Sequence, residues 1–316
     1  MSGESRRGIV IKSTGKHYQV KSGEEVFSCV IRGKIRLSGV KSTNPIAVGD
    51  FVHFDGEDET KTIFKVEERK NHLVRKSVNL SKQQHVIGAN IDEAVLVITH
   101  RFPETLDAFV DRFLVATEAY GIPTHLVMNK IDLLDEDELE DAELRMAYYE
   151  SIGYTTSIIS IEDNFGIEEL KQKLKDKTII LSGNSGVGKT SLLNALQSGL
   201  TLRTSEISDS HGQGMHTTTH AEMILTDFGA NIIDSPGIKG FGMVGIEREE
   251  FRNYFRDFRR YDEECKFHNC LHLNEPKCAV KNALENGEIL YTRYESYLGM
   301  VEEDTENHFR KNIYGG

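Results

Sequence analysis

Residues 183–196, GNSGVGKTSLLNAL, decide the central fold of this chain. The first eight of them fit a phosphate-binding loop placed between a strand, TIILS, and a helix, SLLNAL. Loop N–H groups and the helix N-terminus would hold a β-phosphate, Lys189 would reach the β- and γ-phosphates, and the Thr190 hydroxyl would ligate Mg²⁺. The nucleotide contacts expected here are Gly183, Asn184, Ser185, Gly186, Val187, Gly188, Lys189, Thr190 and Ser191.

The tetrapeptide NKID at residues 129–132 ends another strand, THLVMN, and precedes the loop in the chain. The Asp132 carboxylate can accept from guanine N1–H and N2–H₂ together, a pair of donors that adenine does not offer. Asn129 is expected to support the base edge and the loop, and the stem of Lys130 to cover the ring face. The motif therefore predicts that the bound nucleotide carries guanine.

Two further segments complete the predicted site. Ser160 and Ile161, at the end of YTTSIIS, are placed to offer a backbone N–H to guanine O6. Residues 234–237, DSPG, follow a strand. Asp234 is therefore expected to hold Mg²⁺ through water, and the Gly237 N–H to contact the γ-phosphate.

The order of these motifs is the reverse of that in ordinary GTPases, where the phosphate loop comes first. Alternating strands and helices from residue 91 onward predict a parallel sheet with helices on both faces. Moving the phosphate half in front of the base-reading half restores the ordinary order. Sheet contacts depend on spatial neighbours, so folding tolerates such a cut, and the sequence predicts a circularly permuted domain. The expected strands are 91–99, 124–129 and 154–160, then 178–183, 221–227 and 230–235.

Residues 208–220, SDSHGQGMHTTTH, are polar and glycine-rich, as a mobile switch segment would be. Thr218 is expected to complete Mg²⁺ coordination in the GTP state. Ile238 stands after DSPG, where many small GTPases place a water-orienting Gln, and an aliphatic side chain cannot orient water by hydrogen bonding. The candidates for this catalytic role are His216 first, then His220 and His211.

Five strand-like segments between residues 8 and 70 alternate in polarity and are separated by Gly, Asn, Pro and Asp. They suit a small β-barrel, with an OB-type fold as the first choice. Tyr18 and Phe27 would belong either to the barrel core or to a stacking face for single-stranded nucleic acid. Residues 1–41 carry a net charge of +6 against −12 for the whole chain, so a basic face could meet a phosphate backbone.

Residues 265–278, CKFHNCLHLNEPKC, combine three cysteines and two histidines in fourteen positions. Such a set suits a closed tetrahedral Zn²⁺ site, which is structural. The flanking segments have helical character, so a small helical module tied together by the metal is expected. The expected ligands are Cys265, Cys270, His272 and Cys278, with His268 as an alternative fourth ligand.

The composition is that of an ordinary globular chain, with 38% hydrophobic and 28% charged residues. No apolar run approaches membrane-spanning length, and the N-terminus, MSGESRRGIVIKSTG, lacks the apolar centre of a signal peptide. We therefore expect a cytoplasmic monomer without membrane contact.

In the order and content of its motifs the chain resembles the circularly permuted, ribosome small-subunit-dependent GTPases of the RsgA (YjeQ) family. The markers are NKID before GNSGVGKTSLLNAL, then GMHTTTH, DSPGIKGFG and CKFHNCLHLNEPKCAV, and the resemblance covers nearly the whole chain. It implies an OB-fold RNA-binding domain at 1–72, a circularly permuted GTPase domain at 73–245 and a helical zinc-binding domain at 246–316.

The resemblance also implies a role in late assembly of the 30S subunit. Such proteins bind the subunit in the GTP state, hydrolyse GTP to GDP and phosphate under stimulation by 16S rRNA, and then leave. The family's histidine before the threonine triplet maps onto His216, and its zinc ligands map onto Cys265, Cys270, His272 and Cys278. Two other interpretations remain: an RNA-binding module ordered by nucleotide without turnover, and an adenine-nucleotide kinase or ATPase, which Asp132 and the strand order disfavour.

Overall fold

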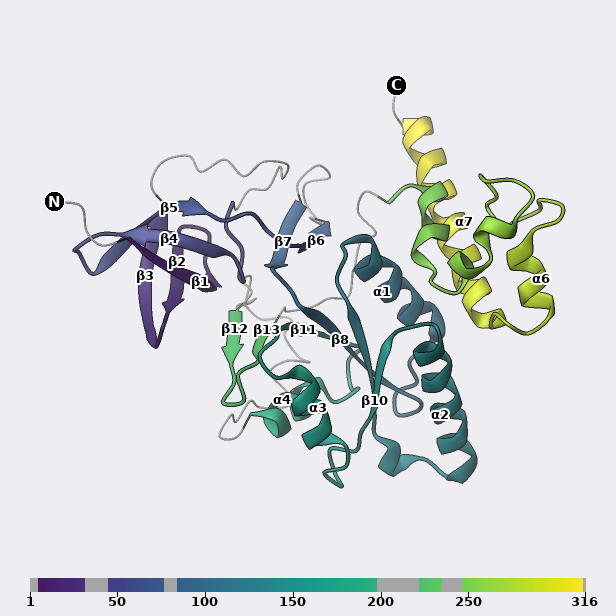
Figure 1. Cartoon of the computed structure of the whole chain (residues 1–316), viewed down its shortest axis with the longest axis horizontal. Helices are drawn as coiled ribbons and strands as arrows, with labels where there is room; N and C mark the ends of the chain where they lie inside the picture. The colour runs from purple at the N-terminus through teal and green to yellow at the C-terminus, as the bar shows by residue number, and fades with distance from the viewer. Residues whose placement is uncertain (1–4, 32–44, 77–83, 198–221, 235–245, 315–316) are drawn as a thin grey trace.

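The computed structural model describes residues 5–31, 45–76, 84–197, 222–234 and 246–314. Three parts follow one another along the chain (Figure 1): a β-barrel, a sheet with helices on both faces, and a helical module beside one of these helices. The three-part architecture expected from the sequence is confirmed, whereas the boundaries at residues 72 and 245 stay a prediction.

The N-terminal barrel closes on itself. Its strand order is β1-β2-β3-β5-β4, and β4 pairs back onto β1. Alternate residues of the strands point inward, so that Val10, Val20, Val52 and Ile63 form its core. The expected five-stranded OB-type barrel is therefore confirmed. Its strands are β1 (Arg6–Ser13), β2 (His17–Ser22), β3 (Glu25–Ile31), β4 (Phe51–Asp55) and β5 (Thr60–Val66).

Tyr18 belongs to the barrel core rather than to a stacking face, and Phe27 is a partly buried residue packed against that core. Tyr18 is only 1% exposed, and its hydroxyl donates to the carbonyl of Gly15 at 3.1 Å. Phe27 packs against the same core, with its ring centroid 5.2 Å from that of Phe54. A buried Tyr18 ring cannot stack on a nucleic-acid base, so the core interpretation is the correct one for this residue.

The central sheet has the order β10-β9-β8-β11-β13-β12. Neighbours are parallel except at β12, which runs antiparallel to β13. β8 opens the base-reading half and lies beside β11, which opens the phosphate half, so the halves meet at the sheet centre. The predicted permuted arrangement is confirmed. The strands are β8 (Glu93–Thr99), β9 (Thr124–Asn129), β10 (Thr155–Ile158), β11 (Thr178–Ser182), β12 (Glu222–Leu225) and β13 (Asn231–Asp234).

In the described part of the chain, helices cover both faces of this sheet (Figure 1). On one face, α1 (Asp107–Ala119) and α2 (Glu136–Ser151) bury Phe113, Leu114 and Met146 against the strands. On the other, α3 (Ile167–Leu174) and α4 (Lys189–Leu196) bury Leu170 and Leu193. Both faces are apolar, which explains why β8 and β9 are buried along their whole length.

Between barrel and sheet lies a hairpin of β6 (His72–Lys76) and β7 (Gln84–Ala89), which the sequence analysis did not predict. The barrel also touches the sheet directly: Lys12 pairs with Glu222 in register, and their side chains form a 2.9 Å ion pair.

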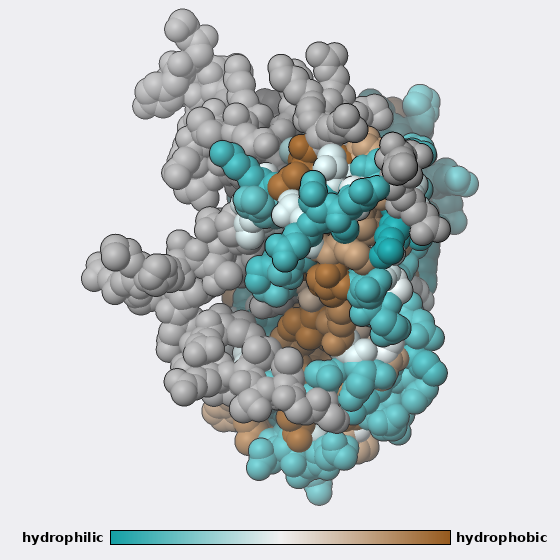
Figure 2. All heavy atoms as spheres, turned by 90° about the vertical axis from the view of Figure 1, so that its left-hand side faces the viewer, coloured by the Kyte–Doolittle hydropathy of each residue, from teal (hydrophilic) through white to brown (hydrophobic). Residues whose placement is uncertain are grey.

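Seen from the barrel side, the described surface is largely hydrophilic around a central band of hydrophobic residues (Figure 2). Among the described residues, no helix combines the length and apolar character needed to cross a membrane.

The C-terminal module is helical, as expected. Its first stretch forms short 3₁₀ segments, and Phe251, Phe255 and Phe258 in and between these segments share one core with Tyr297. α7 runs along α1 (Figure 1). The elements are η2 (Arg248–Tyr254), η3 (Phe258–Arg260), η4 (Asp262–Glu264), α6 (Ala279–Glu285) and α7 (Tyr291–Tyr314).

A buried charge cluster fixes this module onto α1 and α2. Arg293 of α7 is 1% exposed and contacts Asp111 Oδ1 of α1 at 2.5 Å. Its Nη2 donates to Asp257 Oδ1 at 2.7 Å, and its Nε donates to Oδ2 of the same carboxylate at 3.0 Å. The α2 hydroxyls of Tyr149 and Tyr148 donate to Asp111 and Asp257 at 3.0 and 2.9 Å. The module is thus held on the base-reading half of the sheet.

Candidate functional site

The phosphate loop is a tight turn between β11 and α4. Gly183, Gly186 and Gly188 have φ values of 147°, 85° and 98°, which side chains other than glycine rarely adopt. The ammonium of Lys189 lies against the loop, donating to the carbonyls of Gly183 and Asn184 at 2.8 and 2.6 Å. The loop therefore places its backbone and one cation at the N-terminus of α4, a position at which phosphate groups commonly bind.

The remaining loop residues differ in exposure. Ser185 at the tip is exposed, and Ser191 is partly buried. Thr190 is only 8% exposed, in the first turn of α4. Its position directly after Lys189 is where a hydroxyl can reach a metal ion bound to the phosphates.

Asn129 joins the base-reading motif to the phosphate loop. Its Nδ2 donates to the carbonyl of Val187 at 2.8 Å, across 58 positions of sequence. A Cβ on Gly188 would lie 2.4 Å from this Nδ2 and 3.6 Å from Cδ1 of Ile161. Three sequence motifs therefore meet at Gly188, where there is no room for a side chain.

Asp132 and Ser160 are linked through their side chains. Ser160 is 1% exposed, and its hydroxyl donates to Asp132 Oδ1 at 2.8 Å while accepting from the N–H of Asp163 at 3.0 Å. Asp132 itself is exposed. The backbone N–H of Ser160 donates to the carbonyl of Phe165 at 3.1 Å. Only a backbone role was expected for this segment from the sequence; its Ser160 hydroxyl orients the Asp132 carboxylate.

Several predicted residues fall outside the described part of the chain. These are Thr218, Gly237 and the histidines His211, His216 and His220. Asp234 ends β13 on the same side of the sheet as the phosphate loop, but only its backbone is described. Their roles stay predictions.

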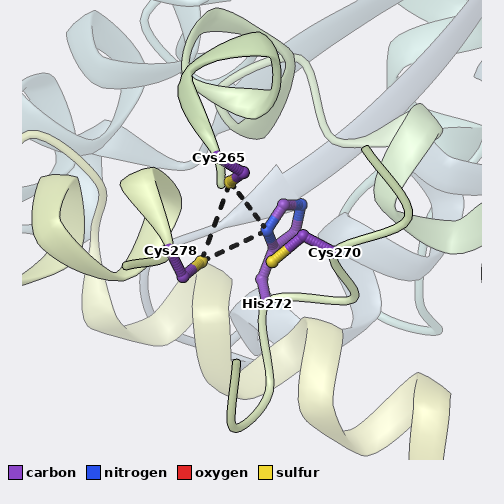
Figure 3. Close-up of side chains that lie close together, drawn as sticks. All are labelled: Cys265, Cys270, His272 and Cys278. Atoms are coloured by element: carbon purple, nitrogen blue, oxygen red, sulfur yellow. Dashed lines mark hydrogen bonds between the residues drawn. The ribbon is translucent and has the colours of Figure 1, made fainter. Parts of the chain in front are cut away.

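The four predicted zinc ligands converge in the C-terminal module (Figure 3). His272 Nδ1 lies 3.4 Å from Cys278 Sγ and 3.7 Å from Cys265 Sγ, and the two sulfurs are 4.0 Å apart. All four donor atoms, including that of Cys270, lie within 4.8 Å of one another. Ligands about 2.0–2.3 Å from a tetrahedral Zn²⁺ have about such mutual separations. His268 is not in this group of described residues; its carbonyl accepts from Arg252 at 2.9 Å.

The chemistry of the donor set also fits a divalent cation. Burial raises the pKa of the Cys270 thiol to about 12 and raises the pKa of Cys278 as well. Burial likewise lowers the pKa of His272, which keeps its imidazole neutral. Asp262 Oδ1 lies 3.3 Å from His272 Nε2 and can orient the ring. Thiols clustered in this way ionise only when a metal ion compensates their charge, so these residues could hold a zinc ion.

Comparisons with known proteins agree with this geometry. The family model of the RsgA GTPase matches residues 66–244, and that of the RsgA N-terminal domain matches residues 7–64. The chain is 52% identical over 312 residues to a Flavobacterium psychrophilum protein named small ribosomal subunit biogenesis GTPase RsgA, covering 97% of this chain and 95% of that protein. A Christiangramia forsetii protein of the same name is 49% identical, with 96% and 98% covered.

Solved structures give the same result. The crystal structure of YjeQ from Thermotoga maritima superposes with a TM-score of 0.79 at 38% identity, covering 96% of this chain and 99% of that one. That of YloQ, described as a circularly permuted GTPase, gives 0.77 at 31% identity, with 96% of each chain covered. The chain therefore belongs to the RsgA family of circularly permuted GTPases and is a GTP hydrolase.

Proposed function

We propose that this chain binds the 30S ribosomal subunit and acts late in its maturation. It hydrolyses GTP to GDP and phosphate under stimulation by 16S rRNA, and hydrolysis drives its release. The relatives at about half identity are named for small-subunit biogenesis, which supports the ribosomal role. The observation that carries the nucleotide chemistry is the 2.8 Å contact between Asn129 and Val187, because it joins the base-reading and phosphate halves into one site.

Guanine selection is proposed to rest on Asp132, and its hydrogen bond to Ser160 supports this role. The Ser160 hydroxyl holds one carboxylate oxygen and leaves the exposed group able to accept from guanine N1–H and N2–H₂. Since the Ser160 N–H is engaged by Phe165, the N–H expected at guanine O6 is that of Ile161. Asn129 braces the loop and the stem of Lys130 covers the ring. The phosphates contact Gly183, Asn184, Ser185, Gly186, Val187, Gly188, Lys189, Thr190 and Ser191, with Gly237 at the γ-phosphate.

Catalysis requires charge neutralisation on the phosphates and an oriented water. Thr190, Thr218 and Asp234 are the proposed residues around Mg²⁺, and Lys189 supplies the fixed cation. His216 is the proposed water-orienting group because Ile238 cannot act by hydrogen bonding. A His216→Ala enzyme should bind GTP as the wild type does and lose about two orders of magnitude or more of the stimulated rate. A full stimulated rate in that variant would remove His216 from the mechanism.

The Cys265, Cys270, His272 and Cys278 site is proposed to hold one structural Zn²⁺, which stabilises the C-terminal module. The basic N-terminal segment and the barrel are proposed to contact 16S rRNA. The protein is proposed to act as a cytoplasmic monomer, which suits a factor that meets the ribosomal subunit.

The decisive experiment compares GTP hydrolysis alone, with purified 30S subunits, and with 50S subunits as the control. The proposal expects strong stimulation by 30S subunits and none by 50S subunits. Binding of the 30S subunit without stimulation would instead favour an RNA-binding module ordered by nucleotide. Equal affinity for ATP and GTP would favour an adenine-nucleotide enzyme.

Base selection has its own test. Asp132→Asn replaces an acceptor by an amide that can donate, so it should weaken GTP and favour XTP, whose C2 carbonyl accepts a hydrogen bond. A loss of GTP affinity of about a hundredfold or more is expected, since a site built to hydrogen-bond a group discriminates strongly against its absence. Unchanged GTP affinity would place the base elsewhere.

A further inference from the structure

The loop at residues 101–105 follows β8 and lies at the same sheet edge as the nucleotide motifs. It is anchored firmly at its base. The hydroxyl of Thr99 donates to the carbonyl of Pro103, the N–H of Thr99 donates to Thr105 Oγ1 at 3.1 Å, and the N–H of Thr105 returns to the Thr99 carbonyl at 3.0 Å. Arg145 of α2 donates to the carbonyl of Thr105 at 2.9 Å. Thr99 and Thr105 are 0% and 1% exposed, so these bonds are shielded from water.

From this base the loop reaches both halves of the nucleotide site. The ammonium of Lys130 donates to the carbonyl of Phe102 at 2.6 Å. A Cβ on Gly186 would lie 3.3 Å from Cδ of Pro103, so the proline ring packs against the phosphate loop. One short loop therefore contacts the base-reading motif through a hydrogen bond and the phosphate loop through a packed ring.

The backbone at the loop tip is strained. Phe102 has a φ of 59°, which is rare for a large side chain, and its side chain is 52% exposed. The guanidinium of Arg101 stacks over its ring at 4.8 Å and is ion-paired with Glu138 of α2. Such conformations persist where the surroundings over-determine them, and they concentrate at ligand sites.

We propose that the 101–105 loop is a positioning element of the nucleotide site. It fixes Lys130 where the lysine stem covers the guanine ring, while its Pro103 ring packs against the phosphate loop at Gly186. A free lysine side chain has many rotamers and must be ordered when nucleotide binds. The carbonyl of Phe102 orders it beforehand, so the loop raises nucleotide affinity without touching the phosphates. This inference rests on the nucleotide site proposed above.

The test uses Thr99→Val in the full chain, which keeps the volume of the side chain and removes the hydroxyl that holds Pro103. Titration with fluorescent GDP should show binding about fivefold weaker than the wild type, as expected for the loss of one ordering hydrogen bond. Thr124→Val is the matched control: Thr124 is 3% exposed, it donates to Thr117 Oγ1 at 2.7 Å, and it lies at the opposite end of the parallel strands. The control should lower thermal stability and leave GDP affinity unchanged.

A double-mutant cycle with Lys130→Met separates positioning from general destabilisation. If the loop acts through Lys130, Thr99→Val should weaken GDP binding much less in the Lys130→Met background than in the wild type. An equal loss in both backgrounds, or wild-type affinity in Thr99→Val itself, overturns the proposal. A wild-type protein that fails to bind GDP would instead overturn the nucleotide site on which the inference rests.

Discussion

Replacing Arg293 with methionine removes the cation that bridges two buried carboxylates, Asp111 and Asp257, at the junction of α7 and α1. Asp111 is 0% exposed and Asp257 is 1% exposed, so water cannot replace the lost partner. Burial raises the pKa of Asp111 above its ordinary range even beside Arg293. At Asp257 burial acts in the same direction, but the charge and hydrogen bonds of Arg293 outweigh it and lower the pKa.

The expected cost is large because both carboxylates must then carry an uncompensated charge or take up a proton. Removing one partner from a buried ion pair costs about 3–5 kcal/mol. That is a substantial fraction of a domain stability of about 5–15 kcal/mol. It corresponds to a fall in Tm on the order of 10 °C.

Differential scanning calorimetry is the suitable assay, since the chain has no tryptophan to report unfolding. Arg112→Ala is the matched control, because Arg112 also links α1 to α7 through a 2.7 Å ion pair with Glu303. Those side chains are 34% and 56% exposed, so solvent screens the pair and its loss should cost about 1 kcal/mol or less. Asp257→Asn added to Arg293→Met should recover part of the lost stability, because it removes one of the unpaired charges.

Two results would refute this reasoning. The first is an Arg293→Met protein that unfolds at the same temperature as Arg112→Ala. The second is further destabilisation, instead of recovery, when Asp257→Asn is added. Either would mean that the junction is held by its apolar contacts and that the buried charges contribute little.

Three further outcomes are expected. Gly188→Ala should weaken GDP binding by about tenfold or more, because the new Cβ would lie 2.4 Å from the side-chain amide of Asn129. Gly287→Ala controls for backbone strain, because Gly287 has a φ of 75° and open space around it. Equal GDP affinities of the two variants in fluorescent-GDP titrations would contradict the meeting of the sequence motifs at Gly188. Cys278→Ser should lose stoichiometric zinc and lower the Tm of the module, as measured by elemental analysis and calorimetry; full zinc content would speak against the assigned ligand. The hydrogen bond from Arg7 lowers the pKa of Glu67 from 4.5 to about 2, so the ionised carboxylate stabilises the barrel at neutral pH and this stability is lost as pH falls through that range. The Tm difference between wild type and Glu67→Gln should therefore shrink from about pH 5 to pH 2, and a constant difference would refute the linkage.

Much of this fold follows from features that lie close together in the chain. A strand, a glycine-rich turn and a helix are contiguous at residues 178–196, so their local pattern identifies the phosphate loop. The predicted zinc ligands lie within fourteen residues, so their spacing alone indicates a shared centre. The motif order is itself a one-dimensional property, and it predicted the permutation that the sheet order then confirmed.

The alternation of polar and apolar residues along β2 did not show whether Tyr18 faces the barrel core or a ligand-binding surface, because either position fits a period of two residues. Closure of the barrel decided it, placing Tyr18 inside with Val20 and Phe54. The sequence pattern also could not identify the hydrogen-bond partner of the Ser160 hydroxyl, because this partner, Asp132, is 28 positions away.

The amino-acid sequence by itself determined most of the elements, the nucleotide motifs and the cluster of three cysteines and one histidine, since short-range spacing and polarity specify each of them. Only the tertiary structure decided how these parts are joined: Asn129 meets Val187 across 58 positions, and Arg293 meets Asp111 across 182. The free energy of burying a charge or an amide depends on the partner that the fold brings to it. That partner cannot be inferred from the residue's neighbours in sequence.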